Sequence, residues 1–387
     1  MKGCILREKM GLLSLFAAIA LVCCGEDSGA WPVTAPPEGC SDATISAFRD
    51  AAAGDDAWYR LSGELVSVTD ADAGSFYLAD DTGYVLVYQM DGFSSYGFTP
   101  GDNISIYARK GSHLGRAEAR NARYAGHARA PYGGYRSPVP GASWLELPAM
   151  KRKDGRVFLH HASKGGGRNY SLCYDLRHHV PVWEAYVLCS GNRGAGKRTD
   201  AYARDPLLDR DEQAALASRS YSPGNGSSYI RGHMVPSADR LDMRDNLDAF
   251  LCTNIVPQDK SLNEGVWEDL EGVIRGKWMP ACDSLYVVTG ADIRGSGSYV
   301  LDNDGKKVTV PVYLYKAVLS YSKDGGYRGI AFRFRNSPDE AAANLKDMAM
   351  SVDELEKILG LDLFANLPDN LELAVESADP RVDKFWW

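Results

Sequence analysis

Two short segments of the chain, 229–240 and 254–271, hold the residues best suited to catalysis. The first contains Arg231, Gly232 and His233 in succession, and the second contains Asn263 and Glu271. An imidazole, an arginine, an amide oxygen and a carboxylate suit metal-assisted cleavage of a phosphodiester. In such a reaction a hard cation neutralises phosphate charge, and the imidazole removes a proton from water. These residue types therefore predict a phosphodiester-cleaving site.

The sequence around His233 predicts that it lies near the end of a strand. Pro236 cannot continue a helix or an interior strand, so regular structure is expected to stop just after His233. Gly232 has no side chain, which would let a large ligand approach the backbone at that point.

The second segment predicts a helix that begins near Asn263. Trp267, Leu270 and Ile274 are apolar residues at helical spacing. Asn263 is therefore expected close to the helix N-terminus. Glu271 follows two turns later, rotated by about 80° from Asn263 in a regular helix.

Together the two segments resemble the DNA/RNA non-specific endonucleases of the ββα-metal type, which include secreted bacterial nucleases and mitochondrial endonuclease G. The hallmark of that family is Asp-Arg-Gly-His-x-x-Pro, then Asn-x-x-Pro-Gln and Asn-x-Gly-x-Trp-x-x-Leu-Glu. The resemblance extends over residues 155–375. The matching residues here are Arg231, Gly232, His233, Pro236, Asn254, Pro257, Gln258, Asn263, Gly265, Trp267, Leu270 and Glu271.

The resemblance implies a role for each matching polar residue. His233 would be the general base, and Asn263 the single direct ligand of one Mg²⁺, with Mn²⁺ or another divalent ion as the alternative. Glu271 would orient the metal-bound waters. Arg231 and Arg198 would neutralise charge that develops on the phosphate. The supporting residues would be Asn254 and Gly232.

A basic loop over residues 191–205 is expected to supply the arginine that contacts the scissile phosphate in the family. Arg198 is the better match and Arg204 is the alternative. The planar guanidinium group binds phosphate oxygens in pairs, which suits it to this task.

One residue departs from the family pattern. Ile230 stands where the family has an aspartate, and the resemblance implies that this aspartate holds the site through charge-assisted hydrogen bonds. Three functions are therefore considered. The first is a sugar-non-specific endonuclease that hydrolyses DNA and RNA. The alternative is a non-catalytic nucleic-acid-binding surface lipoprotein with a degenerate nuclease site. The third is a structural surface protein whose N-terminal β-rich module docks a partner.

The charge of the chain excludes retention on nucleic acid by bulk electrostatics. The formal net charge is −8. Residues 1–23 are net positive, with Lys2, Arg7 and Lys9 against Glu8, so the rest of the chain is more acidic than the whole. Binding of DNA or RNA must then depend on a local basic surface and a metal ion. The composition, with 45% hydrophobic and 24% charged residues, is that of a globular protein.

The N-terminus predicts export as a bacterial lipoprotein. An apolar run over 11–22 is too short to span a bilayer and suits a signal peptide. Residues 1–24 resemble a lipoprotein signal, with Cys24 as the acylated residue and Cys23 as the alternative. The expected location is a membrane-anchored protein facing the periplasm or the cell surface, with residues 25–40 as a tether.

The rest of the chain predicts two folded domains of an α+β protein. Residues 41–130 contain five strand-like runs with turn signals and resemble a small all-β OB-fold barrel. Residues 131–154 are rich in Gly, Pro and Ser and predict a linker. Residues 155–387 would form the ββα-metal nuclease domain around a central mixed or antiparallel sheet. His160 and His161 are predicted at its surface, and nothing in the sequence sets the oligomeric state.

Overall fold

The computed structural model describes residues 34–52, 56–98, 100–128, 143–150, 153, 155–163, 167–221 and 229–387. The predicted signal peptide and Cys24 lie outside the described residues. In the part of the chain that is described, none of the helices combines the length and apolar character needed to cross a membrane.

The first folded part is a small closed barrel. Its strand order is β2-β3-β4-β6-β5, and β5 returns to pair with β2, so the sheet closes on itself. The β4–β6 pair is parallel, whereas the other neighbours around the barrel are antiparallel. The elements are β1 (Ser41–Asp42), α1 (Ile45–Asp50), β2 (Trp58–Asp70), β3 (Ser75–Asp80), β4 (Gly83–Tyr88), η1 (Phe93–Ser95), β5 (Asn103–His113) and β6 (Arg116–Ala128).

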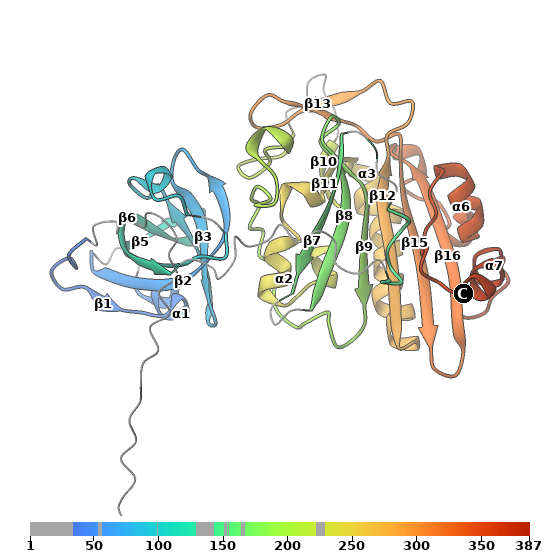
Figure 1. Cartoon of the computed structure of the whole chain (residues 1–387), viewed down its shortest axis with the longest axis horizontal. Helices are drawn as coiled ribbons and strands as arrows, with labels where there is room; N and C mark the ends of the chain where they lie inside the picture. Colours follow the sequence, from blue (N-terminus) through green and yellow to red (C-terminus); the bar gives the residue numbers. More distant parts are fainter. Residues whose placement is uncertain are drawn as a thin grey trace, which may run out of the picture. The chain divides into compact units, whose positions relative to one another are not determined.

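The second folded part is built on a seven-stranded antiparallel sheet in the order β17-β16-β15-β12-β9-β8-β7 (Figure 1). The predicted α+β class, with a small all-β barrel ahead of a domain with an antiparallel sheet, is confirmed. The strands are β7 (Arg156–Ala162), β8 (Arg168–Asp175), β9 (Val180–Leu188), β12 (Ser284–Asp292), β15 (Tyr313–Ser322), β16 (Gly326–Arg335) and β17 (Ala349–Met350).

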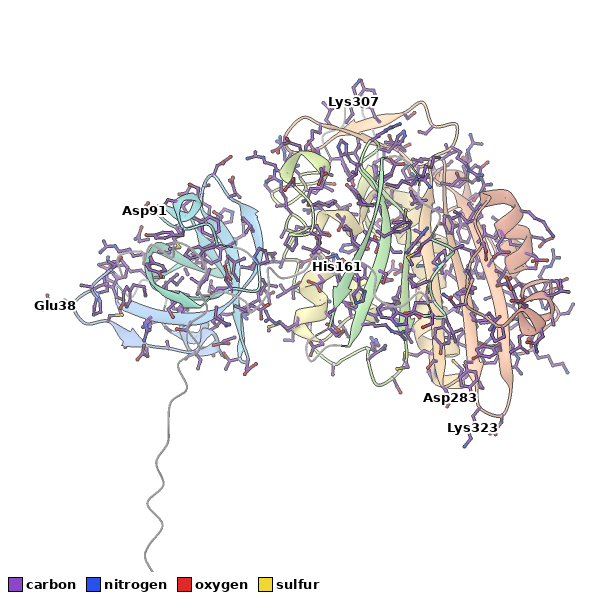
Figure 2. The ribbon with its side chains drawn as sticks, viewed as in Figure 1. Glu38, Asp91, His161, Asp283, Lys307 and Lys323 are labelled. Carbon is purple, nitrogen blue, oxygen red and sulfur yellow. The ribbon has the colours of Figure 1, made fainter. Side chains whose placement is uncertain are left out.

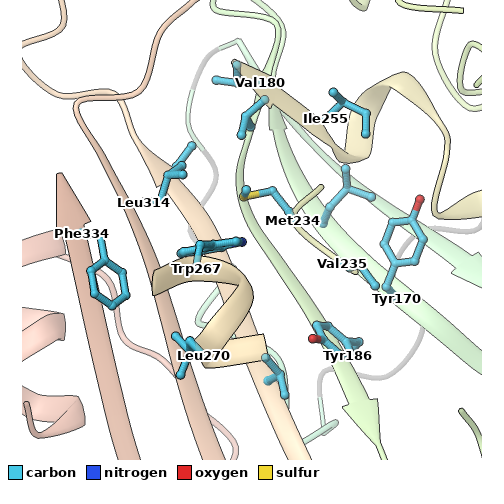
Figure 3. Packing of buried hydrophobic residues seen from close by; sticks show 14 of the residues in the cluster. Tyr170, Val180, Tyr186, Met234, Val235, Ile255, Trp267, Leu270, Leu314 and Phe334 are labelled. Atoms are coloured by element: carbon cyan, nitrogen blue, oxygen red, sulfur yellow. The ribbon is translucent and has the colours of Figure 1, made fainter. Parts of the chain in front are cut away.

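Both faces of this sheet are covered. Successive residues of a strand point to opposite faces, so on β15 Leu314 joins one buried cluster and Tyr315 joins another. The Leu314 side packs against Trp267 and Leu270 of the helical segment, as Figure 3 shows. The Tyr315 side packs against Leu355 and its neighbours in α6 (Val352–Leu359), and α7 (Asp369–Glu376) lies next to β16 (Figure 1).

A separate two-stranded ribbon and the helical segment after it complete the domain. The ribbon pairs β10 (Tyr229–His233) with β11 (Ile255–Asp259) in antiparallel fashion. It leads directly into α3 (Lys260–Leu262), η5 (Asn263–Trp267), α4 (Glu268–Val273) and η6 (Ile274–Trp278). The remaining elements are η2 (Arg210–Glu212), η3 (Ser237–Asp239), α2 (Met243–Asp248), η4 (Cys252–Asn254), η7 (Met279–Ala281), β13 (Tyr299–Leu301), β14 (Lys307–Thr309), η8 (Pro338–Glu340) and α5 (Leu345–Met348).

The prediction that His160 and His161 lie at the surface is wrong. Adjacent residues of a strand point to opposite faces, and both faces of the sheet are covered at β7. His160 packs against Trp144. His161, labelled in Figure 2, is 2% exposed and forms an ion pair with Asp205 at 3.0 Å. Burial alone would lower the pKa of His161, but the Asp205 carboxylate raises it above its ordinary value.

The His161–Asp205 pair predicts a pH-dependent contribution to stability. Because the folded pKa of His161 is raised, its contribution is complete below the unfolded pKa of about 6.5 and is lost as pH rises through the folded pKa. The pKa of Asp205 is lowered despite burial, so its contribution is complete above about pH 4 and is lost in stronger acid.

We therefore expect His161→Gln to lower the free energy of unfolding by about 3–5 kcal/mol near pH 5.5, because Asp205 is left buried without its cation. The loss should shrink as pH rises toward 9. Urea unfolding over this pH range measures the loss in free energy of unfolding at each pH, and His113→Gln, at an exposed residue, is the control. An equal loss at every pH would contradict an ionic pair.

Candidate active site

The β10–β11 ribbon holds His233 at its end. His233 is the last residue of β10 and pairs with Ile255, after which the chain leaves the ribbon. Asn254 fixes the turn that follows. Its side-chain oxygen accepts from the backbone N–H groups of Met234 at 3.2 Å and Val235 at 2.7 Å, and its Nδ2 donates to the Val235 carbonyl at 3.0 Å. These contacts suit the supporting role predicted for Asn254.

Gly232 makes room for a side chain, not for a ligand. A Cβ atom at Gly232 would lie 2.2 Å from Oε1 of Gln258, which is fully buried. This corrects the expectation that Gly232 admits a large ligand to the backbone. Gln258 in turn accepts a hydrogen bond of 2.6 Å from Nδ2 of Asn263. The absent side chain at Gly232 therefore allows Gln258 to orient the Asn263 amide.

The helical segment places Asn263 in its first turns. Asp259 caps α3, accepting from the backbone N–H of Ser261 at 2.9 Å, so Asn263 lies near the helix N-terminus as predicted. The segment bends at Gly265, whose backbone conformation is not helical. A Cβ atom there would lie 2.4 Å from the carbonyl oxygen of Ala341, so the bend depends on glycine.

Four of the predicted catalytic and metal-binding residues line one cavity of about 340 Å³. They come from the loop before β10, from the end of β10 and from the helical segment, which are far apart in sequence. Folding has thus brought an imidazole, an amide, a carboxylate and a guanidinium to a common space. The lining residues are Arg198, His233, Pro236, Ser237, Ala238, Asn263, Glu264, Trp267, Glu268, Glu271 and Arg275.

The surroundings of His233 favour its neutral form. Burial, Arg198 and Arg231 together lower the pKa of His233 to about 3. The ring packs edge-to-face against Phe250 at 4.8 Å between centroids, and its Nε2 has no hydrogen-bond partner among the described residues. An imidazole that is neutral near pH 7 can accept a proton.

Of the two candidate arginines in the basic loop, the structure brings Arg198 to the cavity. Its guanidinium lies over the Phe250 ring at 4.7 Å, and Nε pairs with Asp200 at 2.6 Å. Arg204 is not among the cavity residues and pairs with Asp304 at 2.7 Å. The geometry therefore favours Arg198, which the sequence had ranked first.

Arg231 lies beside the cavity and not in its lining. Its guanidinium stacks over the Tyr202 ring at 3.6 Å and donates to the Leu216 carbonyl at 3.0 Å. After burial and Arg198, its positive charge contributes to the lowered pKa of His233.

An ion-pair network that the sequence did not predict borders the cavity. Arg275 pairs with Asp239 at 3.1 Å and with Glu271 at 3.5 Å, and Asp239 also accepts from the Tyr186 hydroxyl at 2.7 Å. Burial raises the pKa of Glu271 to about 7, and Asp239 adds to the rise. The spacing of Glu271 and Arg275, four residues apart, is a sequence signal for their pairing. No local signal identifies Asp239.

Two buried residues join the loops that carry the site. Asn246 accepts from the backbone N–H of Thr199 at 2.8 Å and donates to the Ser237 carbonyl at 2.9 Å, so it connects the Arg198 loop to the turn after His233. Arg240, 1% exposed, donates from Nη2 to the Val187 carbonyl at 2.8 Å. This hydrogen bond holds the turn after His233 against β9.

The oxygen atoms around the cavity are suitable ligands for a hard divalent cation. Because Nδ2 of Asn263 donates to Gln258, Oδ1 remains as the acceptor. The carboxylates of Glu264, Glu268 and Glu271 also line the cavity. Oxygen atoms of this kind are the ligands that Mg²⁺ and Mn²⁺ prefer in proteins.

Comparison with known proteins identifies the family of this chain. The model of the DNA/RNA non-specific endonuclease family matches residues 158–370. The chain is 33% identical to a nuclease of Nostoc sp. strain PCC 7120, covering 54% of this chain and 75% of that protein. It is 30% identical to a nuclease of Serratia marcescens, covering 55% and 82%. A solved EndoG/EndoGI complex is similar with a TM-score of 0.44 at 21% identity, covering 54% and 86%. The chain belongs to the DNA/RNA non-specific endonuclease family.

Proposed function

We propose that this endonuclease hydrolyses the phosphodiester bonds of DNA and RNA with one Mg²⁺ ion and with His233 as general base. The observation that carries the proposal is the shared cavity of His233, Asn263, Glu271 and Arg198. The site offers groups for a phosphate, a cation and a water, all of which DNA and RNA cleavage have in common. Weak sequence preference follows, because such groups contact the backbone and not the base edges.

The ion would be held by Asn263 Oδ1 and would neutralise phosphate charge and polarise the scissile bond when bound. Mg²⁺ is favoured because it retains most of its waters and needs few protein ligands, and Mn²⁺ is the alternative. Glu271 would accept hydrogen bonds from waters around the ion, while Arg275 holds the carboxylate in place at 3.5 Å.

The protein groups supply proton transfer and charge. Neutral His233 would take a proton from the attacking water at one of its ring nitrogens. Arg198 would bind a phosphate oxygen of the substrate. To do so it would give up its ion pair with Asp200. Arg231 would act at longer range, since Tyr202 and Leu216 already hold its guanidinium.

Observations around Ile230 favour an active enzyme over the degenerate-site alternative. Ile230 pairs with Gln258 across the ribbon, yet Gln258 still accepts the hydrogen bond that orients Asn263. The missing aspartate therefore leaves the predicted metal ligand oriented.

We also infer that the barrel is an OB-fold and that the protein is an exported lipoprotein anchored through Cys24. The barrel has five strands in the order β2-β3-β4-β6-β5, with a parallel β4–β6 pair, which supports an OB-fold. The apolar run and cysteines at the N-terminus support export as a lipoprotein. A spacer or docking role is preferred for the barrel, because acidic residues predominate in its first three strands.

Replacing His233 tests the general base. His233→Ala should lower kcat about 10²–10⁴-fold on both plasmid DNA and RNA, because the attacking water loses its proton acceptor. Initial rates with Mg²⁺, with and without chelator, measure the effect, and exposed His113→Ala serves as the matched control. Unchanged rates in His233→Ala would remove the proposed mechanism.

Replacing Gly232 tests how the Asn263 amide is oriented. Gly232→Ala should displace Gln258 and raise the Mg²⁺ concentration for half-maximal activity about 10-fold or more. The control is Gly272→Ala in α4, where a Cβ atom meets nothing within 4 Å. If both variants need the same Mg²⁺ concentration as the wild type, Gln258 does not position the ligand.

Restoring the family aspartate tests the departure at Ile230. Ile230→Asp should preserve or raise nuclease activity, because a carboxylate there can add charge-assisted hydrogen bonds. Cleavage rates of the variant and the wild type at saturating Mg²⁺ decide the point. A sharp loss of activity in a folded variant would show that the ribbon is built around an apolar residue.

A further inference from the structure

A second group of carboxylates lies between α6 and α7. Oxygen atoms of Asp353, Glu356 and Glu376 all lie within 4.8 Å of one another. Both helices pack closely on β16, since a Cβ atom at Gly329 would lie 3.0 Å from Val352 Cγ2 and 3.2 Å from the Val375 carbonyl oxygen. The cluster therefore joins two helices that share one face of the sheet.

Glu376 is the feature that distinguishes this group from an ordinary acidic surface. It is 2% exposed, and its Oε1 has no hydrogen-bond partner among the described residues. Burying a carboxylate without a partner is costly unless a cation or a proton accompanies it. Burial and the surrounding carboxylates, Glu356 first among them, raise the pKa of Glu376 to about 9.

Among the described residues, Lys357 is the basic side chain that forms an ion pair with the cluster, and it lies at the edge of the cluster. Lys357 contacts Asp353 at 3.6 Å, and the lysine side chain is 77% exposed. Glu356 is held differently, because its Oε1 accepts from the backbone N–H of Leu363 at 2.6 Å. The cluster thus contains oriented oxygen ligands with little compensating positive charge.

We propose that Asp353, Glu356 and Glu376 bind a divalent cation of the calcium type that joins α6 to α7. The three oxygen atoms lie within 4.8 Å of one another, and two calcium ligands at 2.3–2.6 Å can be up to about 5.2 Å apart, so one Ca²⁺ can contact all three. Three carboxylates suit Ca²⁺, which takes many oxygen ligands in flexible geometry, better than Mg²⁺, which retains most of its waters. Waters would complete the shell.

This site is separate from the nuclease cavity. Val352 and Leu355 of α6 belong to the buried cluster on the Tyr315 side of the sheet, whereas Trp267 and Leu270 belong to the cluster on the other side. The ion would stabilise the C-terminal helices and take no part in phosphodiester cleavage.

Thermal unfolding of the full chain tests the proposal without any nuclease assay. After chelation, adding Ca²⁺ to about 100 times its Kd should raise Tm by roughly 5–10 °C. Glu376→Gln should abolish this rise and, without Ca²⁺, should have a Tm close to that of the wild type, because the raised pKa leaves the Glu376 carboxyl mostly neutral when no ion is bound. Glu372→Gln, the same change one turn earlier in α7, alters a carboxyl group that is not a proposed ligand and should retain the rise.

Further variants separate this site from the proposed catalytic ion. Asn263→Ala should keep the Ca²⁺-dependent rise in Tm, and Mg²⁺ at equal concentration should give a smaller rise than Ca²⁺. If Glu376→Gln does not fold, Asp353→Asn replaces it with the same expectation. The proposal is overturned if the wild type shows no rise with Ca²⁺, if the ligand variant responds like the wild type, or if Asn263→Ala loses the response.

Discussion

The hydrogen bond from Asn263 Nδ2 to Gln258 Oε1, 2.6 Å long, is the contact on which the site depends. The Gln258 amide can occupy its position because Gly232 has no side chain there. The β10–β11 register fixes Gln258 opposite Ile230, two residues before Gly232. The same ribbon ends at His233. One pair of short strands therefore sets both the orientation of the proposed metal ligand and the position of the proposed base.

Two titratable groups that line the cavity have pKa values displaced in opposite directions. Burial and two arginines lower the pKa of His233 and keep it neutral. Burial and Asp239 raise the pKa of Glu271, while Arg275 opposes the rise. Groups whose pKa values are displaced in opposite directions are typical of sites that divide acid, base and electrostatic roles. A bound cation would favour the charged form of Glu271 and so complete the arrangement.

The sequence predicted the family, the α+β class and four of the polar residues that line the cavity, because their types and spacing are local features. His233, Asn263 and Glu271 were found because the short motifs around them resemble those of the family. It did not predict the roles of Asp239, which pairs with Arg275 36 residues away, or of Arg240, which donates to Val187 53 residues away. For the same reason it misplaced His161, whose partner Asp205 comes from a distant loop, and misjudged the role of Gly232, which only the position of Gln258 explains. The positions of these residues depend on contacts between distant segments, which local sequence patterns do not reveal.

The most direct measurement is a crystal structure of the protein soaked in Mn²⁺, with the ion located by its anomalous scattering. The proposed geometry predicts one peak in the cavity at about 2.2 Å from Asn263 Oδ1, with Nδ2 of that residue still bonded to Gln258. It also predicts that His233 lies close enough to reach a water bound to the ion. A cavity without an ion at saturating Mn²⁺, or an Asn263 amide turned with its nitrogen toward the ion site, would contradict the proposed mechanism.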